Sequence, residues 1–226
     1  METLNTSIVS LLQMHYFYTM DEKKKHIITQ VGQMYMRHGI RSVTMDDVAS
    51  ELSISKKTLY QYFKDKAELV EHVINHFLMD DSCFCTKEDL KLNAIDRYLW
   101  IRKNVLEMMK VVHNNLEYDL KKGYPSLYKK ITDYKRIKIY DDNFAIIEQG
   151  KKEGLYRESI DSDLVARLAV GRILLIFNPD YGIFADNEIR NIELFDNMMN
   201  YHMHGICTET GLQYYKQQLN NVQNEN

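Results

Sequence analysis

The sequence contains little proline and little glycine, and this shortage restricts the fold class. Only 2 of its 226 residues are proline and 9 are glycine. An all-β sandwich or barrel needs many tight turns, which these two residues commonly form. Leucine, methionine, lysine, glutamate, glutamine and isoleucine are abundant instead, and they favour helices. The composition therefore predicts an all-α protein.

Cysteine and long apolar runs are also scarce. The three cysteines, Cys83, Cys85 and Cys207, are an odd number, which argues against a secreted disulfide scaffold and for a reducing compartment. The apolar run from Ile173 to Phe177 falls far short of the roughly 18 to 20 residues that span a bilayer. The apolar stretch over residues 8–17 follows no basic region and precedes no small-residue cleavage site, so we expect no signal peptide. We therefore predict a cytoplasmic protein with no membrane partner.

The charge is balanced overall but uneven along the chain. The formal net charge of -3 excludes a globally basic, histone-like protein and a polycationic membrane binder. Between Ser53 and Lys66, however, four lysines and one aspartate give a local net charge of +3. A local excess of this kind is expected of a surface that meets phosphates, although a lysine-bearing face is more often only a solvated face.

Four helices are predicted near the N-terminus, and two of them are short. A first amphipathic helix begins near Lys24 and ends at His38-Gly39. Thr44 has the position of an N-cap for a short helix over residues 45–52, and Ser55 has the same position for a short helix over residues 56–63. Asp65 and Glu68, at capping-box spacing, begin a fourth helix. The second and third helices have helix-turn-helix proportions.

Spacing on the third helix separates a buried face from an exposed one. Leu59 and Phe63 lie four residues apart and should pack inward, which leaves Lys56, Lys57, Gln61 and Tyr62 facing outward. The exposed hydroxyls of Thr44, Tyr60 and Tyr62 suit phosphate oxygens, and Lys56 and Gln61 have the reach for base edges.

The segment from Ile27 to Leu69 resembles the N-terminal DNA-binding domain of TetR-family transcriptional regulators. The resemblance depends on the run Thr44-Met45-Asp46-Asp47-Val48-Ala49 and, above all, on the pattern Thr-Leu-Tyr-x-x-Phe-Lys-x-Lys over residues 58–66. It covers about 45 residues. A tail over residues 204–212 is similar to the end of many members, and the length and all-helical remainder also agree with the family.

The resemblance implies that the third helix enters the major groove of DNA. It matches Thr44, Tyr60, Tyr62 and Lys66 to phosphate-contacting positions, and Lys56, Lys57 and Gln61 to base-reading positions. We therefore expect the following DNA-binding residues: Thr44, Ser55, Lys56, Lys57, Thr58, Tyr60, Gln61, Tyr62 and Lys66. Ser53 is a departure, because the family usually has glycine in this turn. Either serine adopts a left-handed conformation at a cost of about 1 kcal/mol or more, or the turn differs slightly.

Three regions are expected along the chain. Residues 1–19 are an extension that could be a packed helix, a disordered tail or the result of a start codon assigned upstream of Met20. Residues 20–68 form the helix-turn-helix DNA-binding domain. Residues 69–226 form a helical domain for effector binding and dimerisation, with helices expected over 87–120, 126–149, 161–178, 185–204 and 209–220. Gly150 to Gly154 and Gly205 are among the expected breaks.

In the resembled family these later helices surround an effector pocket, and the last two long helices pair with a second subunit. That implies a homodimer through helices near 161–178 and 185–204, with an apolar seam formed by Leu164, Leu168, Ile173, Leu174, Leu194 and Met198. Helical domains rich in aromatics and methionines can enclose an apolar cavity, although most such residues are ordinary core. The candidate ligand-binding residues, for an apolar or aromatic small molecule, are Trp100, Met108, Tyr134, Phe144 and Phe177.

Other kinds of site receive less support. His72 and His76 share a helix face, and Cys83 and Cys85 follow them, but the spacing matches neither a metalloprotease nor a zinc knuckle. We expect no metal or other cofactor; a metal-sensing site, or a thiol redox switch at Cys83 or Cys85, is the less favoured alternative. No nucleophile, triad or paired-carboxylate pattern is present, so we expect no enzyme. The sequence is best interpreted as a regulator, most simply a repressor, that binds a palindromic operator as a homodimer. The alternative is a helical small-molecule-binding or scaffold protein that uses the helix-turn-helix for protein contacts.

Overall fold

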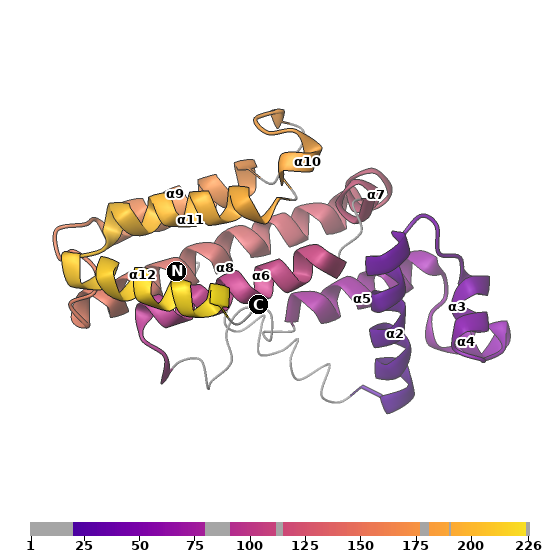
Figure 1. The fold of residues 1–226 in the computed structure, drawn as a ribbon. Helices are drawn as coiled ribbons and strands as arrows, with labels where there is room; N and C mark the ends of the chain where they lie inside the picture. Colours follow the sequence, from indigo (N-terminus) through magenta and orange to yellow (C-terminus); the bar gives the residue numbers. More distant parts are fainter. Residues whose placement is uncertain (1–19, 80–90, 112–114, 177–180, 190, 225–226) are drawn as a thin grey trace. The chain divides into compact units, whose positions relative to one another are not determined.

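The structure is a computed structural model that describes residues 20–79, 91–111, 115–176, 181–189 and 191–224. Within these ranges the named elements are all α-helices, so the all-α prediction is confirmed (Figure 1). The helices are α2 (Glu22–His38), α3 (Met45–Glu51), α4 (Lys56–Tyr62), α5 (Lys66–Met79), α6 (Ala94–Val111), α7 (Asn115–Gly123), α8 (Pro125–Lys152), α9 (Ser162–Ile176), α10 (Asp186–Ile189), α11 (Ile192–Ile206) and α12 (Glu209–Asn224). The N-terminal extension over residues 1–19 lies outside the described residues.

The chain divides into two compact units. The first comprises Met1–Asp81 and Val111–Thr132, and the second comprises Ser82–Lys110 and Asp133–Asn226. Helix α7 therefore belongs with helices α2 to α5, although it follows them by more than thirty residues in the sequence. These units are defined by packing, whereas the boundary expected at residue 68 separates a DNA-binding from an effector-binding function. That functional boundary stays a prediction.

The core of the first unit is built where α2 packs against α5. Ile28 and Val31 of α2 are fully buried, as are Leu69 and Val70 of α5 and Leu59 of α4. This pattern follows from the three- and four-residue spacing of the apolar side chains, which places them on one face of each helix. The short helices α3 and α4 are thus fixed to a common hydrophobic core, which orients their outer faces.

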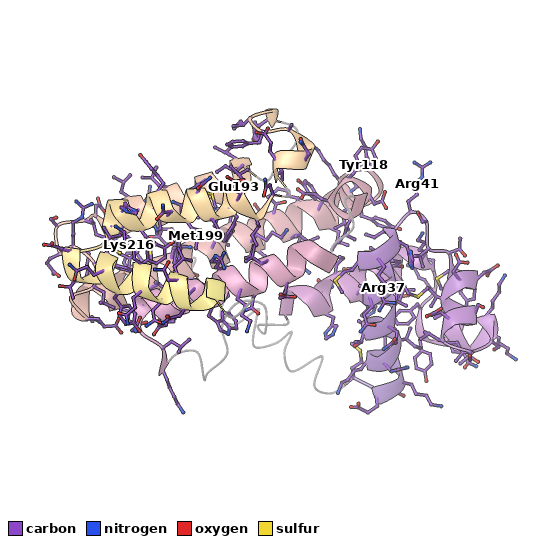
Figure 2. The ribbon with its side chains drawn as sticks, viewed as in Figure 1. Arg37, Arg41, Tyr118, Glu193, Met199 and Lys216 are labelled. Carbon is purple, nitrogen blue, oxygen red and sulfur yellow. The ribbon has the colours of Figure 1, made fainter. Side chains whose placement is uncertain are left out.

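The core of the second unit joins α6, α8, α11 and α12. Ala94, Ile95, Tyr156 and Met203 are almost completely buried there. On α11 the buried and exposed residues alternate with the helical period. Met199 lies in the core, whereas Glu193 of α11 and Lys216 of α12 are exposed (Figure 2).

Two predicted helix boundaries were wrong. The stretch expected over 87–120 contains the end of α6 at Val111 and the start of α7 at Asn115. The stretch expected over 185–204 contains two helices, α10 and α11, and Asn191 caps α11 by accepting a hydrogen bond from the Glu193 amide. In both cases the prediction relied on glycine and proline, and asparagine lies at the start of the new helix instead.

The breaks predicted at Gly150 to Gly154 and at Gly205 fall at helix ends, although Gly150 and Gly205 themselves still lie within their helices. Helix α8 continues through Gly150 to Lys152, and α11 continues through Gly205 to Ile206. Gly150 serves packing, because a Cβ atom there would come within 2.1 Å of the Tyr156 ring. The missing side chain therefore lets Tyr156 enter the core of the second unit against the helix backbone.

A search of the described residues for membrane-spanning helices finds none that combines the necessary length and hydropathy.

Candidate nucleic-acid interface

Helix α3 begins with a capping box. The Thr44 hydroxyl accepts the backbone N–H of Asp47 at 3.2 Å, and the Asp47 carboxylate accepts the Thr44 backbone N–H at 2.8 Å. The same hydroxyl donates to the Asp47 carboxylate at 2.6 Å, and these hydrogen bonds hold the pKa of Asp47 below its ordinary value. The predicted N-cap role of Thr44 is confirmed.

Ser55 caps helix α4 as predicted. Its hydroxyl accepts the Thr58 backbone N–H at 3.0 Å and lies 2.8 Å from the Thr58 hydroxyl. Ser55 and Thr58 therefore fix the start of α4. The cap satisfies one of the N–H groups that the first turn of a helix leaves unpaired.

The turn between α3 and α4 is closed by a serine in the left-handed conformation. Ser53 has φ of 53°, the one non-glycine residue with positive φ in the described part of the chain. Its N–H donates to Ser50 O at 3.1 Å, and the Ile54 N–H donates to Ala49 O at 3.0 Å. This pair of bonds is the Schellman ending of a helix, which normally uses glycine at this position. Of the two alternatives for Ser53, the left-handed one is therefore correct.

The outer face of α4 presents most of the predicted DNA-binding residues. Leu59 and Phe63 are buried, with exposures of 0% and 1%, which confirms the inward face. Lys56, Lys57 and Gln61 are exposed, and Tyr60 is 49% exposed. Tyr62 and Thr58 are only partly exposed, and the Tyr62 ring packs 6.5 Å from the Phe63 ring.

Lys56 is held by an acidic residue of α3. Its Nζ lies 2.5 Å from Asp46 Oδ1, and both side chains are about 60% exposed, at 59% and 61%. The hydrogen bond that Lys56 donates to this carboxylate raises the pKa of Lys56. An exposed pair of this kind contributes little to stability, so it leaves Lys56 able to exchange Asp46 for another anion.

Lys66 faces the loop between α2 and α3 rather than open solvent. Its Nζ donates to the carbonyl oxygen of Arg41 at 3.4 Å, and partial burial lowers its pKa despite the nearby carboxylates of Asp119 and Asp47. The Arg41 amide in turn donates to Asp119 of α7 at 2.8 Å. Lys66 and Asp119 thus tie α5 and α7 to the loop that precedes α3, while the Arg41 side chain projects away from it (Figure 2).

The comparisons with known proteins agree with this geometry. Residues 33–73, which include α3 and α4, match the family model described as bacterial regulatory proteins, tetR family. The uncharacterized HTH-type transcriptional regulator YvaF of Bacillus subtilis is 22% identical over 187 residues, covering 82% of this chain and 96% of YvaF. The HTH-type transcriptional repressor KstR2 of Mycobacterium tuberculosis is 22% identical over 158 residues, covering 65% of this chain and 76% of KstR2.

The fold is also similar to that of a transcriptional regulator from Cytophaga hutchinsonii. That structure has a TM-score of 0.66 at 19% identity, and the match covers 83% of this chain and 100% of the other. Residues 33–73 of this chain form a TetR-family DNA-binding domain. Its relatives are regulators and not enzymes, in agreement with the absence of a catalytic pattern in the sequence.

The predicted ligand-binding residues of this chain are dispersed among different environments. Trp100 on α6 and Tyr134 on α8 are partly buried. Phe144 on α8 is 37% exposed and stacks on Tyr140 with ring centroids 6.0 Å apart. The side chain of Met108 and all of Phe177 lie outside the described residues. The assignment of these residues to an effector site stays a prediction.

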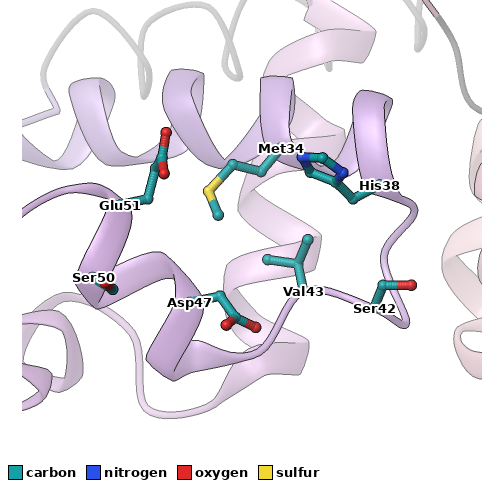
Figure 3. Close-up of a pocket in the computed structure, with 7 residues that line it drawn as sticks. All are labelled: Met34, His38, Ser42, Val43, Asp47, Ser50 and Glu51. Carbon is teal, nitrogen blue, oxygen red and sulfur yellow. The ribbon is translucent and has the colours of Figure 1, made fainter.

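An open groove of about 440 Å³ lies in the first unit, between α2 and α3. Met34 and His38 project into it from α2, opposite Asp47 and Glu51 of α3 (Figure 3). Ser50 of α3 and the loop residues Ser42 and Val43 complete the lining of the groove. None of the described candidate ligand residues lines it, so it is separate from the effector site expected of the family.

The histidines considered as metal ligands have other neighbours. His72 Nε2 lies 3.2 Å from Lys24 Nζ and 3.8 Å from Glu68, and its ring meets the edge of Phe63. Burial lowers the pKa of His72. Cys83 and Cys85 lie outside the described residues, and within those residues no group of three or more His, Cys, Asp or Glu side chains could hold a metal ion.

Sequence reasoning missed three arginines of the second unit that are buried wholly or in part. Arg97 and Arg102 of α6 are each 7% exposed, and Arg172 of α9 has a buried Nε. The signal was present in the sequence. Val165, Ala169, Arg172 and Ile176 follow one another at three- and four-residue spacing and so lie on one face of α9. The other three residues are apolar, so a charged residue on this face is unexpected.

Proposed function

We propose that the protein is a repressor that binds a palindromic DNA operator as a homodimer and is released by a small-molecule effector. The observation that carries the proposal is the outer face of α4, where exposed lysines, hydroxyls and an amide stand on a helix that is anchored by Leu59 and Phe63. Repression is supported by the similarity to KstR2, which is named as a repressor.

On this proposal α4 lies in the major groove of DNA. Lys56, Lys57 and Gln61 read base edges, since they are exposed on one side of the helix. Thr44, Tyr60, Tyr62 and Lys66 hold phosphates, with the capped helix start at Ser55 and Thr58 beside them. On binding, Lys56 exchanges its contact with Asp46 for a base or a phosphate. Lys66 exchanges its contact with the Arg41 carbonyl in the same way.

Homodimerisation is supported by an apolar stripe on α9. Leu164, Leu168 and Leu175 are 53%, 61% and 41% exposed, and Tyr201 on α11 is 83% exposed. Large exposed apolar side chains grouped on one helix face are typical of protein interfaces. Met198, which the sequence placed in this seam, is 9% exposed and packs inside its own unit, so we leave it out of the interface.

The dimer is tested with Leu168→Glu, which places a charge in the proposed interface. Light scattering of the purified full chain should change from the mass of a dimer to that of a monomer. Tyr118→Glu is the matched control, because Tyr118 is similarly exposed, at 56%, but lies on α7. A wild-type monomer, or an unchanged dimer in Leu168→Glu, would contradict the α9 interface.

The DNA-binding role is tested by selecting bound sequences from a random pool of double-stranded DNA. The wild type should enrich a palindrome whose half-sites are separated by roughly one helical turn or a multiple of it. Lys56→Ala and Gln61→Ala should each relax the preference at particular base pairs, whereas Lys66→Ala should weaken binding to all sequences alike. Enrichment that is identical in all three variants would refute the residue assignment, and no enrichment by the wild type would refute the function.

A further inference from the structure

Arg172 is a charged residue on the core-facing stripe of helix α9. Val165 and Ile176 pack against the core of the second unit, Ala169 is fully buried, and Arg172 lies at the same helical spacing between them. Its Nε–H is buried without a hydrogen-bond acceptor. The one hydrogen bond of its guanidinium within the described residues is long, 3.4 Å from Nη2 to the hydroxyl oxygen of Tyr98.

The comparison with Arg102 shows what Arg172 lacks. Arg102 is buried in the same unit, and its Nε and Nη2 each lie 2.6 Å from an oxygen of Asp196. This two-pronged pairing neutralises the charge and satisfies the donors. No carboxylate within the described residues pairs with Arg172 in this way. A buried Nε–H of a charged guanidinium that has no acceptor is costly, so the site favours an added anion.

The side chains beside Arg172 cannot supply that anion. Tyr98 on α6 is buried, and burial raises its pKa to about 12, so its hydroxyl stays neutral. His202 on α11 is also buried and stacks on the Tyr98 ring with centroids 5.5 Å apart. Burial, followed by the charge of Arg172, lowers the pKa of His202 to about 3, so the imidazole is neutral too. The net charge of this group of three residues is therefore +1.

We propose that Arg172, Tyr98 and His202 form the binding site for the carboxylate of a monoanionic organic effector. The free Nε–H and an adjacent Nη–H match the two oxygens of a carboxylate, and Arg102 with Asp196 shows the same geometry within this protein. The Tyr98 hydroxyl and the neutral imidazole offer further polar groups on α6 and α11.

The surroundings of the three residues define the remainder of the ligand. A dianionic phosphate would need a second positive charge, and the neutral His202 does not provide one. Tyr98 belongs to a hydrophobic cluster that also contains Phe195 of α11, and Ile101 of α6 and Ile176 of α9 pack against this cluster. A carboxylate attached to an apolar chain or ring therefore fits the site, while free phosphate and phosphate monoesters do not.

This inference depends on the effector part of the proposed function, and it adds a mechanism of regulation. The site joins α6, α9 and α11. A bound carboxylate that accepts hydrogen bonds from groups on these helices favours whichever arrangement brings the donors together. Such a ligand shifts the equilibrium between DNA-binding and released forms only if its affinity for the two arrangements differs.

The test measures binding of defined carboxylates to the full chain by isothermal titration calorimetry and thermal shift. The probes are octanoate, 4-methylpentanoate, phenylacetate and indole-3-acetate, each compared with its primary amide, which has the same shape but no charge. Octyl phosphate serves as the dianionic probe. The variants are Arg172→Met, which keeps an apolar side chain of similar length, and Arg172→Lys, which keeps the charge but loses the planar pair of donors. Arg136→Met is the control, because Arg136 is exposed on α8.

We expect at least one carboxylate to bind the wild type and Arg136→Met at least tenfold more tightly than its amide and than octyl phosphate. Arg172→Met should bind the carboxylate and the amide alike, and Arg172→Lys should bind the carboxylate with intermediate affinity. The melting temperature of ligand-free Arg172→Met should equal or exceed that of the wild type, since an unpaired buried charge is removed. If Arg172 served only to stabilise the fold, its replacement by methionine would lower the melting temperature.

Three results would overturn the inference: no carboxylate of the panel binds, Arg172→Met binds the carboxylate as tightly as the wild type does, or octyl phosphate is preferred. These measurements need no DNA, so they stand apart from the proposed function. Release of operator DNA only by neutral ligands would refute the carboxylate site and leave the repressor intact. Tight carboxylate binding by a chain that binds no DNA would refute the repressor and leave the site intact.

Discussion

Removal of Asp196 should strongly destabilise the second unit, because it would leave Arg102 buried without its counter-ion. The pair joins α6 to α11 through two bonds of 2.6 Å, and the side chains of Arg102 and Asp196 are 8% and 28% exposed. Breaking a buried pair by deleting one partner typically costs about 3 to 5 kcal/mol. Because Asp196 retains some contact with water, we expect Asp196→Ala to cost about 3 kcal/mol, at the lower end of that range.

This loss is large enough to measure by thermal and chemical unfolding. A chain of this size loses roughly 2 to 4 °C in melting temperature per kcal/mol, so Asp196→Ala should melt roughly 6 to 12 °C lower than the wild type. The double variant Arg102→Leu with Asp196→Leu should recover most of the loss, because it buries no unpaired charge. Asp141→Ala removes an exposed carboxylate of α8 as the control and should change stability by no more than about 0.5 kcal/mol. A loss below about 1 kcal/mol in Asp196→Ala, or no recovery in the double variant, would refute the reasoning.

Two further predictions concern Ser53 and His202. Ser53→Gly should raise the free energy of unfolding by up to about 1 kcal/mol, because φ of 53° strains serine and not glycine. Ser53→Val should lower the free energy of unfolding. Equal stability of the wild type and both variants in urea would contradict the strained turn. Because the pKa of His202 is lowered from 6.5 to about 3, its neutral form stabilises the fold fully above pH 6.5 and that stability is lost as pH falls toward 3. Between pH 6.5 and 4.5 the wild type should therefore lose about 2 to 3 kcal/mol more than His202→Phe, and parallel pH profiles would show that His202 is not the group responsible.

The sequence predicted local structure well where one short segment determines it. The caps at Thr44 and Ser55 and the inward direction of Leu59 and Phe63 follow from neighbouring residues alone. The two possibilities for Ser53 were also recognised from the sequence, because the need for a left-handed residue at the end of α3 is local.

Contacts between distant residues could not be predicted in the same way. The bond from the Arg41 amide to Asp119 joins residues 78 apart in sequence, and the pair of Arg102 and Asp196 joins residues 94 apart. No local pattern indicates which carboxylate approaches which donor. The role expected of Lys66 was incomplete for this reason, since its contact with the Arg41 carbonyl depends on how the loop before α3 folds back toward α5.

Helix ends were predicted poorly where asparagine, rather than glycine or proline, marks the boundary. Asn115 begins α7, and Asn191 caps α11. By contrast, Gly150 lies within α8 because the Tyr156 ring occupies the space of its absent side chain. A glycine thus indicates a turn or a close approach, and only the tertiary packing distinguishes the two.

The salt dependence of binding to the selected operator tests most directly whether the α4 face docks on DNA in a chain whose net charge is -3. The logarithm of the wild-type association constant should fall linearly with the logarithm of salt concentration. Lys66→Ala should weaken binding and reduce the magnitude of that slope by about 1, whereas Lys57→Ala, which removes a base contact, should weaken binding with a smaller change of slope. Lys216→Ala on α12 is the control and should leave the slope unchanged. No salt-dependent binding by the wild type, or slopes that are equal in all four proteins, would contradict the account.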